Sequence, residues 1–130
     1  MYGTHKLLSA LVIGALLVSF ALKSGAGTPF DPQALAAAQA TGKPVLVEVF
    51  ADWCSTCAQQ RSVLSELLRQ PAYKDYQVLI VDFDQQKDAL KLLGVRDRST
   101  LIVYKGKEEK GRLTWETSRD GIAALLNKAI

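Results

Sequence analysis

The chain has 130 residues, of which 48% are hydrophobic and 22% are charged. These values fit a single globular domain with a substantial core, together with a short leader. The formal net charge is +3, and it falls to +1 (14 basic against 13 acidic residues) once Lys6 and Lys23 of the leader are set aside. No basic face or stripe stands out, which argues against a nucleic-acid partner.

An apolar segment of 16 residues runs from Leu7 to Leu22, between Lys6 and Lys23. It is long for the core of a signal peptide and shorter than the roughly 20 residues of a transmembrane helix. We expect residues 1–26 to be a cleaved signal peptide, an uncleaved membrane anchor with its linker, or a buried core helix. The first two alternatives leave a domain over residues 27–130 outside the cytoplasm, which in a bacterium is the periplasm.

The first part of this domain contains a linker, a helix and a strand. Small residues and a proline predict a linker over Gly25–Pro29. Asp31-Pro32 is a favourable helix start, with an acidic N-cap and a proline at the first helical position, and Thr41-Gly42 ends that helix. Val45–Phe50 is a nearly continuous apolar run of strand length. It predicts a central strand that is covered on both faces.

The rest of the chain alternates between helical and strand patterns and closes with a hairpin and a helix. The expected elements are a helix over Cys54–Arg69, a strand over Val78–Phe83, a short helix over Gln86–Leu93, a hairpin of Leu101–Tyr104 with Lys110–Trp115, and a last helix capped by Ser118. This order predicts an α/β fold, a mixed central β-sheet with helices on both faces, preceded by the N-terminal hydrophobic leader or anchor helix.

Both cysteines of the chain lie in the segment Ala51-Asp52-Trp53-Cys54-Ser55-Thr56-Cys57, directly after the apolar strand. If Cys54 opens a helix, the two thiols share a face and can close into a disulfide. The positive end of the helix dipole also stabilises a thiolate at the helix N-terminus and makes it nucleophilic near neutral pH. The motif therefore predicts thiol–disulfide exchange.

From about residue 30 onward the chain resembles the thioredoxin family. The resemblance rests on Ala-Asp-Trp-Cys-x-x-Cys after a hydrophobic strand, and on Gly94-Val95-Arg96 followed four residues on by Thr100-Leu101. The Ala-Asp-Trp-Cys form is also similar to the periplasmic C-terminal domain of the transmembrane thiol–disulfide interchange protein, a reductant relay. The resemblance implies a thioredoxin-like fold in which Cys54 attacks, Cys57 is the buried resolving thiol, and Trp53 packs beside the pair. It implies no cofactor and no metal.

Glu48 interrupts the apolar run of the central strand. On strand alternation it shares a face with Leu46 and Phe50, so we expect it to be partly buried, and burial disfavours the charged carboxylate. The family resemblance implies that an acid at this position shuttles a proton for Cys57. The alternative is a strand-edge glutamate that reaches water.

Ser99 is a departure from the family, which carries a cis-proline facing the cysteines at this position. A cis bond without proline costs about 2.5–4 kcal/mol, so we expect a trans Arg98–Ser99 bond and a reshaped substrate loop. Two interpretations of Ser99 remain open. In the first, its hydroxyl bonds a thiolate and the charge of Arg98 favours the thiolate form of Cys54. In the second, the serine reflects drift in a protein that places fewer demands on its substrate. Thr100 joins this active-site environment, as do Ser55 and Thr56, whose hydroxyl groups can also bond a thiolate.

Several other residues are expected to have structural or solvated positions. Trp115 on the hairpin is assigned to packing, Arg61 to a solvated position, and the acids of Asp82-Phe83-Asp84 to solvent at a strand exit.

The leading hypothesis is a thiol–disulfide oxidoreductase that acts on protein disulfides or thiols. Its expected location outside the cytoplasm favours the reducing direction. A membrane or soluble redox protein is the expected second partner. One alternative is a copper- or zinc-binding or delivery module that uses the same thiols. A closed zinc site needs about four ligands, whereas the only histidine, His5, lies in the leader. A third alternative is a non-catalytic interaction domain, which the intact Cys-x-x-Cys motif disfavours.

Overall fold

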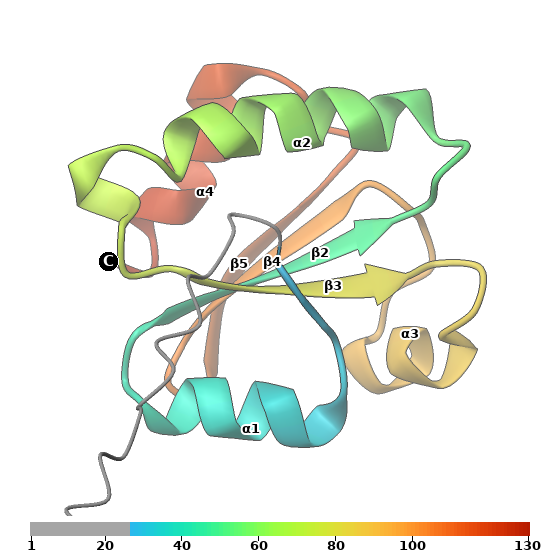
Figure 1. Cartoon of the computed structure of the whole chain (residues 1–130), viewed down its shortest axis with the longest axis horizontal. Helices are drawn as coiled ribbons and strands as arrows, with labels where there is room; N and C mark the ends of the chain where they lie inside the picture. Colours follow the sequence, from blue (N-terminus) through green and yellow to red (C-terminus); the bar gives the residue numbers. More distant parts are fainter. Residues whose placement is uncertain (1–26) are drawn as a thin grey trace, which may run out of the picture.

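The computed structural model describes residues 27–130, and the leader predicted for residues 1–26 lies outside them. The described residues form five strands and four α-helices. Figure 1 shows how they are arranged. Their bounds are β1 Thr28–Pro29, α1 Pro32–Ala40, β2 Pro44–Phe50, α2 Ser55–Leu67, a 3-10 turn Pro71–Tyr73, β3 Gln77–Asp82, α3 Lys87–Leu93, β4 Thr100–Lys105, β5 Glu108–Thr114 and α4 Arg119–Asn127.

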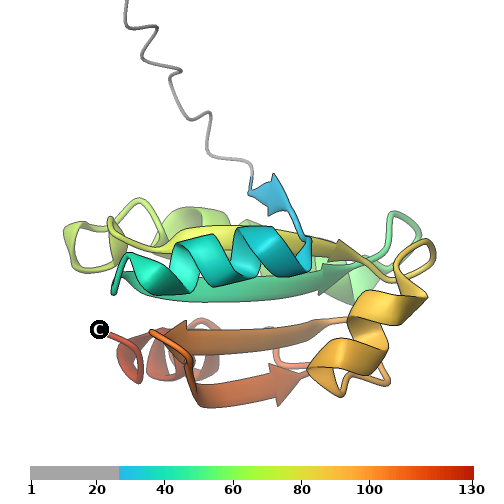
Figure 2. The same ribbon diagram turned by 90° about the horizontal axis from the view of Figure 1, so that it is seen from below.

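The strands form one mixed sheet in the order β1-β3-β2-β4-β5. β1, β3 and β2 are parallel, whereas β4 runs antiparallel to both β2 and β5. Figure 2 shows β1 and β5 at opposite edges of the sheet. Helices α2 and α4 cover one face, and α1 and α3 cover the other (Figure 1). The predicted α/β fold with a mixed central sheet is confirmed.

The central strand β2 separates two cores. Val45, Val47 and Val49 face the core under α1 and α3, whereas Leu46 faces the core under α2 and α4. All of these side chains are fully buried, which confirms the prediction of a strand covered on both faces. Because side chains alternate along a strand, Glu48 shares the face of Leu46 and lies below α2.

The linker prediction for Gly25–Pro29 is wrong at its C-terminal end. Thr28–Pro29 forms β1, which pairs with Leu79 and Ile80 of β3. Gly27 allows this close approach, because a Cβ there would lie 2.8 Å from the Val78 side chain and 2.9 Å from its carbonyl oxygen. A two-residue edge strand is too short to leave a periodic pattern in the sequence.

The ends of the helices follow the expected caps. The side chains of Asp31 and Ser118 accept hydrogen bonds from Ala34 and Gly121, at the starts of α1 and α4. The second hairpin strand was predicted over Lys110–Trp115, but β5 ends at Thr114, so Trp115 lies outside the observed strand, with a φ of 65°.

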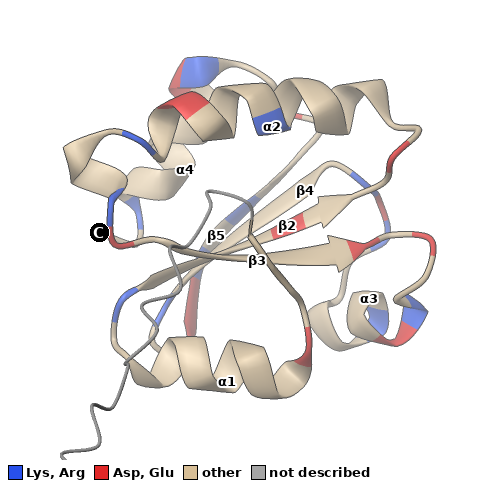
Figure 3. Ribbon diagram, viewed as in Figure 1, with Lys and Arg blue, Asp and Glu red and all other residues tan. Residues whose placement is uncertain are grey.

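No helix within residues 27–130 has the length and apolar character needed to cross a membrane. Acidic and basic residues are scattered over both helical layers and the sheet edge (Figure 3).

Candidate active site

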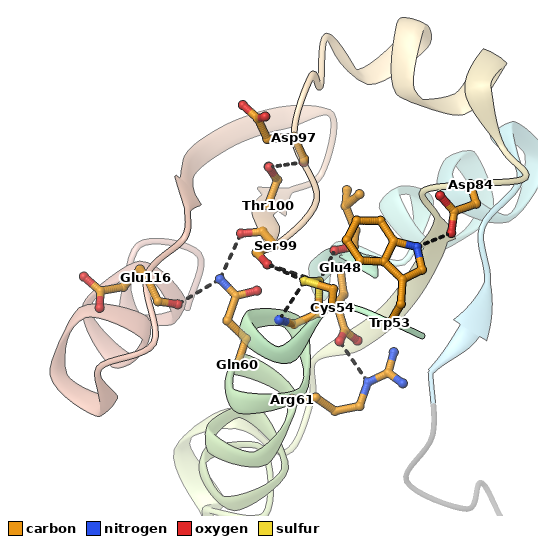
Figure 4. Close-up of a disulfide and its surroundings, with 12 residues drawn as sticks. Glu48, Trp53, Cys54, Gln60, Arg61, Asp84, Asp97, Ser99, Thr100 and Glu116 are labelled. Atoms are coloured by element: carbon orange, nitrogen blue, oxygen red, sulfur yellow. Dashed lines mark hydrogen bonds and ion pairs between the residues drawn. A yellow bond between two sulfur atoms is a disulfide. The ribbon is translucent and has the colours of Figure 1, made fainter. Parts of the chain in front are cut away.

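Cys54 and Cys57 form a disulfide at the N-terminus of α2, with their Cα atoms 5.2 Å apart (Figure 4). Cys54 is the N-cap of this helix, and its Sγ accepts a hydrogen bond of 3.1 Å from the backbone N–H of Cys57. The predicted helix starts at Cys54, whereas the observed helix starts one residue later and the sulfur of Cys54 occupies the capping position. Both cysteines are almost fully buried, at 4% and 1% exposure. The helix N-terminus therefore directs an N–H group at the sulfur of Cys54.

Ser99 lies against both sulfur atoms. Its Oγ is 3.3 Å from Cys54 Sγ and 3.1 Å from Cys57 Sγ, and the residue is fully buried. The peptide bonds of the described residues are all trans, as expected for a serine in place of the family's proline. A disulfide has no proton to donate, so the serine hydroxyl is the donor in this state. Of the two interpretations of Ser99, a hydrogen bond to sulfur or relaxed substrate demands, the geometry favours the hydrogen bond.

The backbone of Ser99 has a φ of 58°, which is uncommon for a residue other than glycine. Hydrogen bonds hold it there: its N–H donates to Val49 O at 3.1 Å, and its carbonyl accepts from Trp115 N at 3.0 Å. Such a conformation costs about 1–3 kcal/mol and persists where its surroundings over-determine it. The result is a hydroxyl group fixed beside the disulfide.

Gln60 is a site residue that is not among those predicted from the sequence. It is 1% exposed, and its Nε2 donates to Ser99 O at 2.9 Å and to Glu116 O at 2.8 Å (Figure 4). It thereby ties α2 to the loops before β4 and after β5. Its signal in the sequence is a glutamine at i+3 from Cys57 and i−4 from Leu64, on the buried face of the helix.

Glu48 is 4% exposed on the central strand, so the alternative of a strand-edge glutamate is wrong. Its Oε1 accepts a hydrogen bond of 2.9 Å from Arg61 Nε. The Arg61 side chain is 41% exposed, in agreement with the solvated position predicted for it, and its guanidinium carbon also lies 3.4 Å from the centroid of the Phe50 ring. A buried carboxylate needs such a partner, and the helix above β2 supplies it.

Trp53 lies beside the disulfide, but its side chain is 60% exposed rather than packed (Figure 4). Its Nε1 donates to Asp84 Oδ2 at 2.7 Å, so this acid, expected to be only solvated, positions the indole. The Arg98 guanidinium carbon lies 4.6 Å from the centroids of both Trp53 and Trp115. The exposed Trp115 thus joins the site, in contrast to the packing position predicted for it.

The hydroxyl-bearing residues of the expected active-site environment differ in position. Thr100 Oγ1 donates to Asp97 O at 2.7 Å and lies 3.1 Å from Thr114 Oγ1, so Thr100 braces the loop that carries Ser99. Ser55 is exposed and Thr56 is half-buried at the start of α2. In the described part of the chain neither of these two hydroxyl groups bonds to a sulfur atom; Ser99 makes those contacts.

Metal-binding groups are sparse near the sulfurs. Within residues 27–130 no cluster of three or more His, Cys, Asp or Glu side chains has the arrangement to hold a metal ion.

Comparison with known proteins agrees with this site. The thioredoxin family model matches residues 30–128. Among solved structures, Trxlp from Edwardsiella tarda is 42% identical with a TM-score of 0.74, and the match covers 78% of this chain and 98% of that chain. A thioredoxin from Pseudomonas aeruginosa is 32% identical over 67% of this chain and 80% of its own length. A protein disulfide-isomerase from Neurospora crassa is 36% identical over 80% of this chain.

These relatives differ in how much of them the chain spans. It covers 29% of the Neurospora protein and about half or less of three further curated relatives. The shared part contains the fold and both cysteines, since the family match extends over nearly all of the described residues. The chain belongs to the thioredoxin family, and its Cys54–Cys57 pair is that of a thiol–disulfide oxidoreductase.

Proposed function

We propose that the chain exchanges electrons with the disulfides or thiols of partner proteins, with Cys54 as the attacking thiol and Cys57 as the resolving thiol. The observation that carries this assignment is the position of Cys54 Sγ. It accepts the N–H of Cys57 at 3.1 Å and lies 3.3 Å from the Ser99 hydroxyl. Both donors stabilise negative charge on this sulfur. Because the Ser99 hydroxyl also lies 3.1 Å from Cys57 Sγ, the N–H of Cys57 at the helix N-terminus is the donor that favours Cys54 as the thiolate.

In the reducing direction, the Cys54 thiolate attacks one sulfur of a partner disulfide. The partner's S–S bond breaks, a mixed disulfide with Cys54 forms, and one partner sulfur leaves as a thiolate. Cys57 then loses its proton and attacks Cys54 Sγ. This step forms the Cys54–Cys57 disulfide and releases the second partner thiolate. The partner gains two electrons, both supplied by the dithiol of this chain.

We assign the proton of Cys57 to Glu48. This carboxylate is buried on β2 directly below α2, the helix that carries Cys57, and its face of the strand packs against that helix. Arg61 reaches it from the same helix. A buried acid below the cysteine helix is placed to accept a proton during resolution and to return it in the reverse direction.

We further propose that the domain works outside the cytoplasm, in a bacterium in the periplasm, either secreted or anchored by the N-terminal segment. The apolar segment Leu7–Leu22 behind Lys6 supports this proposal. In an oxidising compartment we favour a reductant that keeps partner thiols reduced, recharged by a membrane or soluble redox protein.

The direction of electron flow is tested by the equilibrium reduction potential of the full chain. Trp53 fluorescence, beside the disulfide, is followed in glutathione or dithiothreitol buffers. A value near about −270 mV supports a reductant, whereas a value near about −120 mV makes the protein an oxidant. Loss of any reversible two-electron transition would contradict oxidoreductase function. Titration of the reduced protein with copper or zinc would then test the metal-delivery alternative.

The location is tested separately with a membrane-impermeant thiol reagent on intact cells. We expect Cys54 to be labelled before lysis after mild reduction. A variant chain without residues 7–22 serves as the control and should be labelled only after lysis. Labelling of the full chain only after lysis would contradict an extracytoplasmic location.

A further inference from the structure

Two exposed indole rings and one arginine form a cluster at the edge of the disulfide. Trp53 follows β2, Arg98 precedes β4, and Trp115 follows β5. The guanidinium carbon of Arg98 is 4.6 Å from the centroid of each ring, and the two tryptophans are 60% and 42% exposed. We call these residues the Trp–Arg–Trp cluster. Large exposed aromatic side chains of this kind are frequent at protein-binding surfaces.

The cluster is held by the same groups that build the active site. Trp53 Nε1 donates to Asp84, and the backbone N–H of Trp115 donates to the carbonyl of Ser99, whose hydroxyl touches both sulfurs. Arg98 is the residue directly before Ser99. A partner segment whose disulfide reaches Cys54 must therefore pass next to the cluster.

The cation of Arg98 has no carboxylate partner among the described residues. The four ion pairs found there use other basic side chains, and Arg98 Nε is buried without a hydrogen-bond acceptor. The nearby Asp84 accepts from Trp53, and the carboxylate of Asp97 points away from the disulfide (Figure 4). Stacking against aromatic faces restricts a guanidinium while leaving its edge free for a planar anion.

We propose that Arg98, held by Trp53 and Trp115, binds a carboxylate of the partner protein beside the disulfide that Cys54 attacks. The inference rests on the proposed function and adds a substrate preference to it: partner segments with an acidic residue next to the reacting cysteine. Docking removes water from the cluster, which strengthens a charge-assisted and bidentate arginine–carboxylate contact. The two rings supply the apolar area around that contact.

The test uses the full reduced chain and two disulfide peptides that differ only in Glu or Gln beside the attacked cysteine. We compare kcat/KM for the two peptides within each protein. The expected preference of the wild-type chain for the Glu peptide is about tenfold, as for one charge-assisted contact, and high salt should reduce it. Because the ratio compares two peptides on the same protein, a change in overall reactivity cancels.

Arg98→Gln should bring the ratio close to one, and Arg98→Lys should leave an intermediate ratio, since an ammonium keeps the charge but not the planar geometry. Arg96→Gln is the matched control, because Arg96 is exposed two residues away and should leave the tenfold ratio intact. Equal rates for both peptides on the wild-type chain, or an unchanged ratio in Arg98→Gln, would overturn the inference alone. No reaction with either peptide would overturn the proposed function and this inference with it.

Discussion

A single hydroxyl group, that of Ser99, lies within hydrogen-bond distance of both sulfur atoms. A hydroxyl bonds a thiolate more strongly than it bonds a disulfide sulfur, so it stabilises the reduced form. We expect Ser99→Ala and Ser99→Gly to lower the reduction potential by about 30 mV, equivalent to about 1.4 kcal/mol. The pair separates two effects: both variants lose the hydroxyl, but only glycine relieves the positive φ. Potentials that match the wild-type value in both variants would contradict this role.

Glu48 provides a second test at the residue scale. Glu48→Gln keeps the shape of the buried side chain but removes the group that accepts a proton. We expect the release of a partner from the mixed disulfide to slow by about 10²-fold, measured in single turnover near neutral pH. Glu66→Gln is the control, because Glu66 pairs with Arg119 at the exposed surface. Equal release rates in the two variants would assign Glu48 a purely structural role.

Helix α2 is connected to two loops through Gln60, which decides how rigidly Ser99 is held. Replacing it by leucine leaves the carbonyl of Glu116, in a part-buried contact, without the donor that it has in the structure, and removes one donor from the buried Ser99 O. We expect Gln60→Leu to lower the free energy of unfolding by about 2 kcal/mol. Urea unfolding of the reduced protein measures this value. Gln59→Leu, at an exposed position on the same helix, should change it by less than about 0.5 kcal/mol.

The capping arrangement at the start of α2 combines structure and reactivity in one atom. The sulfur of Cys54 accepts the N–H of Cys57, a contact that an aspartate or serine side chain makes at other helix starts. The strand β2, the turn after it and the first turn of α2 therefore place the reactive sulfur where backbone N–H groups point. This is why a short segment between a buried strand and a helix is sufficient to build the reactive end of the site.

At the scale of the whole molecule, the titration of two tyrosines makes the free energy of unfolding depend on pH in the alkaline range. The pKa of Tyr76 is raised above its ordinary value of 10.0, mainly by burial and to a smaller extent by the neighbouring Tyr73. The pKa of Tyr104 is also raised, mainly by burial and then by the charge of Glu109, whereas the charge of Arg112 lowers it. Above pH 10 the unfolded chain loses these protons while the folded chain retains them, so the free energy of unfolding falls as the pH rises.

Tyr76→Phe tests this dependence. Urea unfolding between pH 8 and 11 should show a shallower decline in the variant, because one of the two groups no longer titrates. Below pH 9 the variant should be less stable than the wild-type protein, because Tyr76 Oη donates to Leu126 O at 2.6 Å. An alkaline decline as steep as that of the wild-type protein would show that Tyr76 does not cause it.

The sheet also shows how an exposed edge is protected. β5 lies at one edge and carries charged side chains at Glu108, Glu109, Lys110 and Arg112. Charges along an edge strand disfavour pairing with a second chain.

The sequence by itself determined the features that depend on neighbours along the chain. Hydrophobic periodicity and helix capping are local, so three features were predicted correctly. They are the buried strand β2 from its apolar run, the helix starts at Asp31 and Ser118, and the disulfide from the spacing of the cysteines. The trans bond before Ser99 followed from the absence of proline. Even the burial of Glu48 followed from alternation along a strand.

The tertiary structure alone decided which distant groups meet. Three such pairings between separate elements are Glu48 with Arg61, Gln60 with the Ser99 loop, and Arg98 with two tryptophans. A single sequence can show that Glu48 or Gln60 is on a buried face, but not which group each side chain meets. The same limit explains the errors at Trp115 and β1. Each was judged by its local pattern, whereas its surroundings come from strands and loops that only the folded chain brings together.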